Sequence, residues 1–395
     1  MFYGWWVVGC AFLLALWGWG LGFYGLAVYL VSLRATRFWS TGDVSTAFTA
    51  YYFLGATLTI FSGDVFRRVG PRVAVTAAAV AMAVAVAALP VVTALWQLYL
   101  AMAMMAVAWA GMSLAAVNIL VAPWFVERRG TALSLALTGA SCGGVLVAPG
   151  LLWLIGRGGF RAAMWAAAAV MLVTLMPAVL VILRRSPPAA AGPAPVPMAT
   201  QRRQALGTLR YWTISISYAM GLAAQVGVIT HLVAFLAPRI GADGAGIALS
   251  VTTLCAVLGR FYLGPAVRRL GPRPVSCLNF LQEALGLALL VTAAGAPALY
   301  AGCVLVGLAV GNMITLPGLL VQSEFEPAAF GAVVSLIVGI NQFAFALAPA
   351  AVGILRDRTG GYGSALGFCI ALLVAAALLI LVGGRARPAR GVSRA

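Results

Sequence analysis

The sequence predicts an all-α polytopic membrane protein with twelve transmembrane helices in two pseudo-symmetric bundles of six. Of its 395 residues, 63% are hydrophobic and only 8% are charged, whereas soluble domains carry about 25% charged residues. Apolar runs recur along the whole chain, and a string rich in arginine and glycine occurs twice. A soluble globule of this size still needs a polar surface, so lipid must cover much of this protein.

Helices are the expected form of the apolar runs, because backbone groups in lipid must bond within their own segment. A crossing helix needs about 20 residues. The expected spans are 5–33, 42–62, 71–92, 96–122, 130–156, 160–184, 209–237, 244–266, 272–294, 296–321, 328–354 and 362–384. The expected domains are an N-terminal bundle over 1–184, a Pro- and Ala-rich cytoplasmic linker over 185–208, a C-terminal bundle over 209–384 and an Arg-rich tail over 385–395.

The basic residues predict the orientation of the chain. The net charge is +17, and a strong basic balance can mark a nucleic-acid-binding protein. Here the arginines lie in short segments between apolar runs, so we expect a lipid bilayer and no nucleic acid as the partner. With both termini in the cytoplasm, seventeen arginines lie on the cytoplasmic side and seven outside. This asymmetry predicts a protein of the cytoplasmic (inner) membrane with cytoplasmic N- and C-termini.

Enzymatic and metal-binding motifs are missing from the sequence. The six cysteines include no C-x-x-C pair, and there is a single histidine, which argues against disulfides and most metal sites. Nucleotide-binding, zinc-protease and nucleophile-elbow strings do not occur. We therefore expect a protein that is not an enzyme and has no cofactor or metal. We also expect a monomer.

The repeated string divides the chain into two related halves. GDVFRRVGPR at 63–72 returns as GPAVRRLGPR at 264–273, an offset of 201 residues. GGF at 158–160 returns as GGY at 360–362, an offset of 202. Two matches at nearly one offset indicate internal repetition, as is common in secondary transporters.

The twelve spans, the linker and the repeated string resemble the major facilitator superfamily over the whole chain except the tail. Three stretches are similar to its monocarboxylate and oxalate–formate porter branch: YGWWVVGCAF at the start, NILVAPWFVERRGTALSLALTGASCGG at 118–144 and GILRDRTGGYGSALGF at 353–368. The resemblance implies two six-helix bundles that carry a small-molecule substrate by alternating access.

The resemblance also implies a gating role for the repeated string. The superfamily's loop motif has an Asp that caps a facing helix, but Arg67 and Arg268 stand at that position. Asp64 could replace it in the first half, whereas the second half has Pro265 there. The expected gating-loop residues are Gly63, Asp64, Arg67, Arg68, Gly70, Arg72, Gly264, Arg268, Arg269, Gly271, Arg273 and Glu127. The arginines either anchor the topology alone or join a network with Glu127, Glu324 and Glu326.

The glycines of the string have simpler expected roles. Gly63 and Gly264 should let helices approach closely. The Gly70-Pro71 and Gly271-Pro272 pairs should each form a tight turn and start the next helix.

Arg260, inside the eighth span, is the first candidate for binding substrate. Ionisable residues within spans are costly and mark functional sites, and a guanidinium forms two parallel bonds with a carboxylate. The resemblance supports this role, because the branch places an Arg four residues before a Gly, as Arg260 and Gly264 do. The alternative is an Arg that extends to the membrane surface. Tyr24 aligns with a Lys of animal carriers and could donate to a carboxylate, whereas Ala256 replaces their proton-coupling acid.

Other polar residues in the spans leave several roles open. His231 could bind substrate, carry a coupled proton or bond between helices. Glu283, with Asn279 one turn earlier, could couple protons or hold two helices together. The remaining candidates for lining the site or for interhelical bonds are Asn118, Asn312, Gln225, Asn341 and Gln342.

The expected function is secondary transport of a small organic anion, a monocarboxylate, with protons as the candidate coupled ion. One alternative is a proton-coupled exporter of drugs or metabolites, which the spacing of Gly130, Gly139 and Gly143 favours. Against it, Gly144 stands where exporters have a Pro. The second alternative is a non-transporting sensor or partner subunit, which would not need polar residues such as Arg260 and His231.

Overall fold

The computed structural model describes residues 2–125, 128–185, 203–326 and 329–383. The first half contains α1 (Gly4–Trp19), η1 (Gly20–Tyr24), α2 (Gly25–Arg37), α3 (Thr41–Val69), α4 (Pro71–Ala88), α5 (Leu95–Met112), α6 (Leu114–Val121), η2 (Ala122–Trp124), α7 (Arg129–Cys142), η3 (Gly143–Val147) and α8 (Ala148–Ile182). The second contains α10 (Leu209–Leu270), α11 (Pro272–Thr292), α12 (Ala296–Val310), α13 (Leu316–Glu324), α14 (Phe330–Ala346), α15 (Ala348–Thr359) and α16 (Tyr362–Val382).

These helices make the twelve expected crossings. Nine helical stretches in the described residues are long and apolar enough to cross a membrane. Two of them contain two crossings each, because α8 turns at Gly159 and α10 turns at Gly241, where the backbone leaves helical geometry. α12 and α13 form one further crossing, interrupted between them. The all-helical fold with two bundles of six is therefore confirmed.

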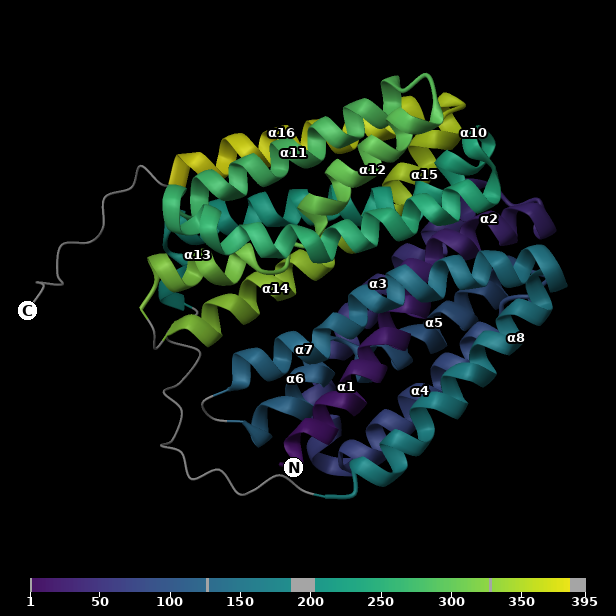
Figure 1. Cartoon of the computed structure of the whole chain (residues 1–395), viewed down its shortest axis with the longest axis horizontal. Coiled ribbons are helices and arrows are strands. Elements are labelled where there is room, and N and C mark those ends of the chain that lie inside the picture. Colours follow the sequence, from purple (N-terminus) through teal and green to yellow (C-terminus); the bar gives the residue numbers. More distant parts are fainter. Residues whose placement is uncertain (1, 126–127, 186–202, 327–328, 384–395) are drawn as a thin grey trace, which may run out of the picture.

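The two halves lie side by side as separate groups of helices (Figure 1). Tyr3, at the start of the chain, bonds the carbonyl of Ile182 at the end of α8 at 2.7 Å. In the second half Arg273, at the start of α11, bonds the carbonyl of Ile380 near the end of α16 at 2.5 Å. Each half therefore begins and ends at the same end of the helix bundles, which we call the terminal side. We call the other end of the bundles the opposite side. Most of the expected linker and tail, 186–202 and 384–395, lies outside the described residues.

The internal repeat is also present in the backbone. Gly70 and Gly271 have φ angles of 81° and 85°, and Gly159 and Gly360 have 76° and 73°. Both pairs are 201 residues apart, the offset of the repeated string. A positive φ favours glycine over residues with a Cβ. The ψ angles also match at Gly70 and Gly271, 154° and 161°, so the same turn recurs there, whereas Gly159 and Gly360 differ in ψ, 170° and 4°. After Gly70 and Gly271, Pro71 and Pro272 begin α4 and α11, which confirms the predicted turns.

Two expectations about these segments are wrong. Residues 63–69 and 264–270 are the last turns of α3 and α10 rather than loops, because these helices continue past their apolar stretches. Gly63 and Gly264 do not mediate close packing either. A Cβ on Gly63 would meet nothing within 4 Å, and one on Gly264 would meet only the Arg268 side chain at 3.6 Å. Both glycines face open space at the terminal side.

Close helix packing instead depends on other glycines. A Cβ on Gly139 would collide with the backbone of Phe12, and one on Gly143 would collide with that of Leu16. In the second half, Gly259 lies equally close to the backbone of Leu308. Small residues allow such approaches in lipid. Gly139 and Gly143 therefore have a structural role in holding α7 and η3 against α1.

The tenth crossing is broken where the sequence predicted a continuous helix. α12 ends at Val310, a turn follows, and Pro317 lies in the first turn of α13. The ring of Pro317 has no N–H to continue the helical ladder. The N–H of Thr315 donates to Asn312 at 3.0 Å, and this leaves the carbonyl of Gly311 free of a helical partner.

Candidate functional site

The halves contact each other through α3 and α15 on the opposite side. The N–H of Gly42, in the first turn of α3, donates to Asp357 Oδ2 at 2.5 Å. The N–H of Ala350, in the first turn of α15, donates to Thr49 Oγ1 at 3.1 Å. First-turn N–H groups have no partner within their own helix. Each helix therefore caps the start of the other, and Asp357 supplies a negative charge where the α3 dipole favours it.

Small side chains bring α3 and α15 together. A Cβ on Gly353 would lie 2.6 Å from Ser45 Oγ and 3.1 Å from the Thr41 carbonyl. The same contact includes His231, of which only 1% is exposed. Its Nε2 lies 3.3 Å from Ser45 Oγ and 3.1 Å from the Pro349 carbonyl. Its Nδ1 lies 3.1 Å from the Tyr362 hydroxyl, so both ring nitrogens of His231 have partners between helices.

A cavity of about 230 Å³ lies between the halves. Its walls come from α1, η1, α5 and α6 in the first half and from α10 and α12–α14 in the second. The lining residues are Trp19, Phe23, Tyr24, Trp109, Leu114, Leu222, Gln225, Val226, Ala256, Arg260, Val310, Gly311, Met313, Ile314, Pro317, Gly318, Val334, Val338, Asn341, Gln342 and Phe345. A mostly apolar cavity with a few polar groups is the usual form of a small-molecule site.

Arg260 is held at the wall of this cavity by the broken tenth crossing. Its Nε donates to the free carbonyl of Gly311 at 3.2 Å. No hydrogen bond to its two terminal nitrogens occurs within the described part of the chain, so the guanidinium can still bind a ligand. Tyr24, in the widened π-helical turn η1, lines the same cavity.

Two buried amides add to the polar wall, which also includes the half-buried Gln342. Gln225 and Asn341 are 4% and 3% exposed. The Oε1 of Gln225 and the Oδ1 of Asn341 have no hydrogen-bond partner in the described residues. Leaving such a group unpaired costs about 1–3 kcal/mol. Both amides therefore have bonding capacity left for a ligand or water, and they line the same cavity as Arg260 and Tyr24.

Asn312, Asn118 and Glu283 lie away from the cavity wall. Asn312 Nδ2 donates to Asn279 Oδ1 at 3.0 Å and to Tyr262 at 3.2 Å, and so connects neighbouring helices of the second half. Asn118 Nδ2 donates to the carbonyl of Leu114 on its own helix at 2.8 Å. Glu283 is fully buried, and neither carboxylate oxygen has a partner in the described residues.

The arginines of the repeated string do not join the halves. Asp64 pairs with Arg67 on the same helix, and both side chains are more than half exposed. Arg68, Arg268 and Arg269 are exposed. Each of the three ion pairs found in the described ranges lies within one half. Exposed pairs contribute about 0–1 kcal/mol, so in this conformation Asp64 does not replace the missing gate acid. Glu127 lies outside the described residues.

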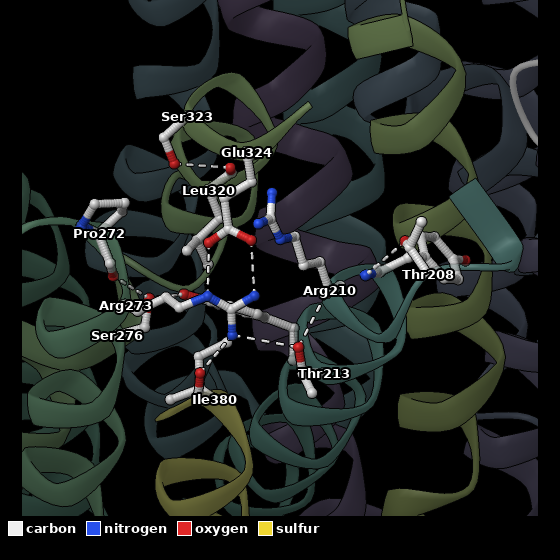
Figure 2. Close-up of polar contacts among 12 residues, drawn as sticks. Thr208, Arg210, Thr213, Pro272, Arg273, Ser276, Leu320, Ser323, Glu324 and Ile380 are labelled. Atoms are coloured by element: carbon white, nitrogen blue, oxygen red, sulfur yellow. Dashed lines mark hydrogen bonds and ion pairs between the residues drawn. The ribbon is translucent and has the colours of Figure 1, made fainter. Parts of the chain in front are cut away.

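Arg273 is the exception within the string. Figure 2 shows its guanidinium facing Glu324, with bonds of 2.6 and 2.8 Å from Nε and Nη2. Its Nη1 also donates to Thr213 at 3.2 Å. Arg273 is only 6% exposed. It joins α11 to α13, α10 and α16, so the predicted partnership with Glu324 occurs inside the second half.

The aromatic lining of the cavity was not predicted. Trp19, Phe23, Trp109 and Phe345 all face it. In a membrane sequence aromatic residues are expected at the lipid interface, so the sequence did not indicate that these four line a central cavity. The i, i+4 spacing of Trp19 and Phe23, next to Tyr24, is the one sequence signal that could have indicated a shared face. Among the described residues, no group of three His, Cys, Asp or Glu could hold a metal.

Comparison with known proteins identifies the family. A search of curated protein sequences gave no match. The nucleoside transporter NupG has a similar structure, with a TM-score of 0.75 and 15% identity, over 98% of this chain and 100% of that one. A bacterial homolog of the human lysosomal transporter Spinster, in an inward-facing and occupied conformation, is also similar. Its TM-score is 0.74 and its sequence identity is 15%, over 98% of this chain and 97% of that one.

These identities indicate a shared fold, and the closer likeness to the monocarboxylate branch stays a prediction. The family model of the Major Facilitator Superfamily matches residues 8–243, more than half of the sequence. The paired six-helix bundles and the cavity between them are consistent with this match. The chain belongs to the Major Facilitator Superfamily of membrane transporters.

Proposed function

We propose that the protein is a secondary transporter that moves a small organic anion, a monocarboxylate, by alternating access. The observation that carries the proposal is Arg260, the one charged residue among those that line the cavity in the described structure. A guanidinium keeps its charge at all physiological pH values and matches a carboxylate geometrically. Tyr24, Gln225 and Asn341 add hydrogen-bonding groups around it.

The contact between α3 and α15 supports alternating access. It closes the opposite side, which is the external side if the arginine asymmetry sets the orientation. In that orientation the cavity belongs to an inward-facing state. Transport then requires the bonds of Asp357 and Thr49 across the halves to break while contacts form on the terminal side. Bundles that rock about a central site are the general mechanism of such folds.

The exporter alternative is less well supported by the cavity. A site for cationic drugs would need a negative charge, and the lining residues include no Asp or Glu. At Gly144, where exporters would have a Pro, a Cβ would lie 2.8 Å from Tyr24 and 2.5 Å from Thr253. A bulkier residue there would displace Tyr24. A non-transporting sensor or partner subunit would not need polar groups in the cavity, and so this alternative does not explain Arg260 or the two unpaired amides.

Proton coupling remains a separate proposal that rests on Glu283 and His231. Glu283 is buried with no partner for either oxygen, and an isolated charge in such a place is very costly. It is therefore a candidate for carrying a proton. His231 bonds to Ser45 across the contact between the halves. A proton on His231 would therefore affect how the halves close on the opposite side rather than how substrate binds. Glu283→Gln should abolish any pH-gradient dependence of uptake if Glu283 carries the coupled proton.

Uptake into proteoliposomes tests the proposed function. Radiolabelled acetate, lactate and benzoate should be taken up by the native chain. Arg260→Gln should lower uptake by about ten-fold or more, because charge-assisted bonds contribute about 1.5–3 kcal/mol. Arg161→Gln is a matched control, since Arg161 is exposed and outside the cavity. Equal uptake by Arg260→Gln and the native chain would refute the proposal.

A further inference from the structure

Five aromatic side chains from both halves line the cavity that contains Arg260. Trp19, Phe23, Tyr24 and Trp109 come from the first half, and Phe345 comes from the second. The ring centroids of Trp19 and Trp109 are 5.0 Å apart, with 59° between the planes. Phe23 and Tyr24 form an edge-to-face pair at 5.0 Å and 87°. Both distances, and the edge-to-face angle of the second pair, are those that aromatic rings prefer, so the wall is built from interacting rings.

The fold makes specific room for Trp109. A Cβ on Gly55 would lie 3.1 Å from Trp109 Cδ1, and one on Gly22 would lie 3.2 Å from Trp109 Cε3. Gly22 is also fixed, because its carbonyl accepts a 2.7 Å bond from the buried Tyr51 hydroxyl. Trp109 is only 7% exposed. Its ring therefore has a defined position against the cavity.

Phe345 brings the second half into the same wall. Its ring meets Tyr52 of the first half edge-to-face, at 5.5 Å and 88°. The aromatic wall therefore spans the boundary between the halves. A ring-shaped ligand here would contact both halves at once, as alternating access requires of its cargo.

The charges that line the cavity limit the ligand further. One guanidinium and no carboxylate line it in the described structure. A dicarboxylate would leave its second charge without a partner, and an amino acid would leave its ammonium without one. Buried charges of this kind are strongly disfavoured. The site therefore suits one negative charge attached to an uncharged body.

We propose that the cargo is an aromatic monocarboxylate, with its carboxylate on Arg260 and its ring against Trp109, Trp19 and Phe345. This inference rests on the proposed function and narrows it to a substrate class. A cavity of about 230 Å³ has room for roughly eight water molecules at the volume of the liquid. That space accommodates a single-ring acid such as benzoate, and it is much larger than acetate or formate needs.

Ligand binding to the full-length protein in detergent tests the substrate class. Isothermal titration should measure the Kd of four carboxylates. Benzoate has an aromatic ring, cyclohexanecarboxylate a saturated ring, acetate a small apolar group and oxalate a second negative charge. Burying a ring should make the Kd of benzoate about ten- to a hundred-fold lower than that of acetate. Contacts between rings should place benzoate about three-fold or more below cyclohexanecarboxylate.

Substitutions separate the aromatic wall from the anion site. Trp109→Leu should raise the Kd of benzoate about ten-fold while the Kd of acetate stays within two-fold, which also shows that the variant folds. Trp153→Leu is the matched control, because Trp153 is 53% exposed on the outside of the bundle. It should leave both constants unchanged.

The outcomes distinguish two kinds of failure. If acetate or oxalate binds as tightly as benzoate, and Arg260→Gln abolishes binding of all of them, the aromatic inference is wrong and the anion site stands. Equal affinities for benzoate and cyclohexanecarboxylate would also overturn the aromatic inference. If no carboxylate binds in a manner that depends on Arg260, the proposed function itself fails.

Discussion

Arg260 and Arg273 show how the surroundings of one residue type decide its role. Arg273 uses its guanidinium on Glu324, Thr213 and the Ile380 carbonyl, so it holds helices together. Arg260 bonds one backbone carbonyl through Nε, and its remaining nitrogens are available at the cavity. Both lie at or within expected spans, where an arginine is costly. Arg273 therefore stabilises the second bundle, and Arg260 is the candidate for binding substrate.

At this scale we predict that Arg273→Ala destabilises the protein strongly. Removing one partner of a buried pair leaves the other charge uncompensated and costs about 3–5 kcal/mol. Unfolding of the purified protein, followed by tryptophan fluorescence, should occur at a clearly lower temperature. Arg67→Ala removes an exposed pair with Asp64 and should cost less than about 1 kcal/mol. Equal transition temperatures for both variants would contradict the structural role of Arg273.

At the scale of elements, the contact between α3 and α15 holds the two halves together on the opposite side. The sequence lacks the acid that the superfamily places on the terminal side, where Arg67 and Arg268 stand. A carboxylate does cap a helix between the halves, but it is Asp357 on the opposite side. Gly353 and Ser45 allow the approach that makes this bond possible. The described conformation is thus closed by a helix cap at the end where the sequence did not predict one.

We predict that Asp357→Asn weakens this closure. Removing a negative charge from a helix N-terminus costs about 0.3–1 kcal/mol, so the ratio of closed to open molecules should fall about two- to five-fold. Double electron–electron resonance between spin labels at Phe38→Cys and Arg358→Cys, with the native cysteines replaced, measures that ratio. Asp243→Asn, at another exposed acid of the opposite side, is the control. An unchanged distance distribution would show that Asp357 does not hold the contact.

The whole molecule combines two repeated bundles with an asymmetric contact between them. The two bundles share the glycine turn at Gly70 and Gly271 and a positive-φ glycine at Gly159 and Gly360. The cavity lining is not symmetric, because four of its five aromatic residues come from the first half and Arg260 comes from the second. Duplication therefore explains the scaffold, while the candidate site depends on later differences between the halves.

At this scale we predict that both termini lie in the cytoplasm. The arginine excess that supports this acts through the positive-inside rule. A green fluorescent protein fused after Ala395 should fluoresce in a bacterial host, and an alkaline phosphatase fused there should be inactive. The same phosphatase fused after Gly241, at an opposite-side turn, should be active. The reverse pattern would invert the orientation and make the described state outward-facing.

The sequence alone determined the helical class, the twelve crossings, the turns and the repeat, because these depend on local composition and on the requirement that backbone groups in lipid bond internally. It also singled out Arg260, Gln225 and Asn341, since polar groups within spans are rare and costly, and the family resemblance added Tyr24. Only the tertiary structure decided which polar residues meet. It placed His231 between the halves, Asn312 among helices, and Trp109 at the cavity. These positions depend on helix rotation and on contacts between residues far apart in sequence, which hydropathy does not encode.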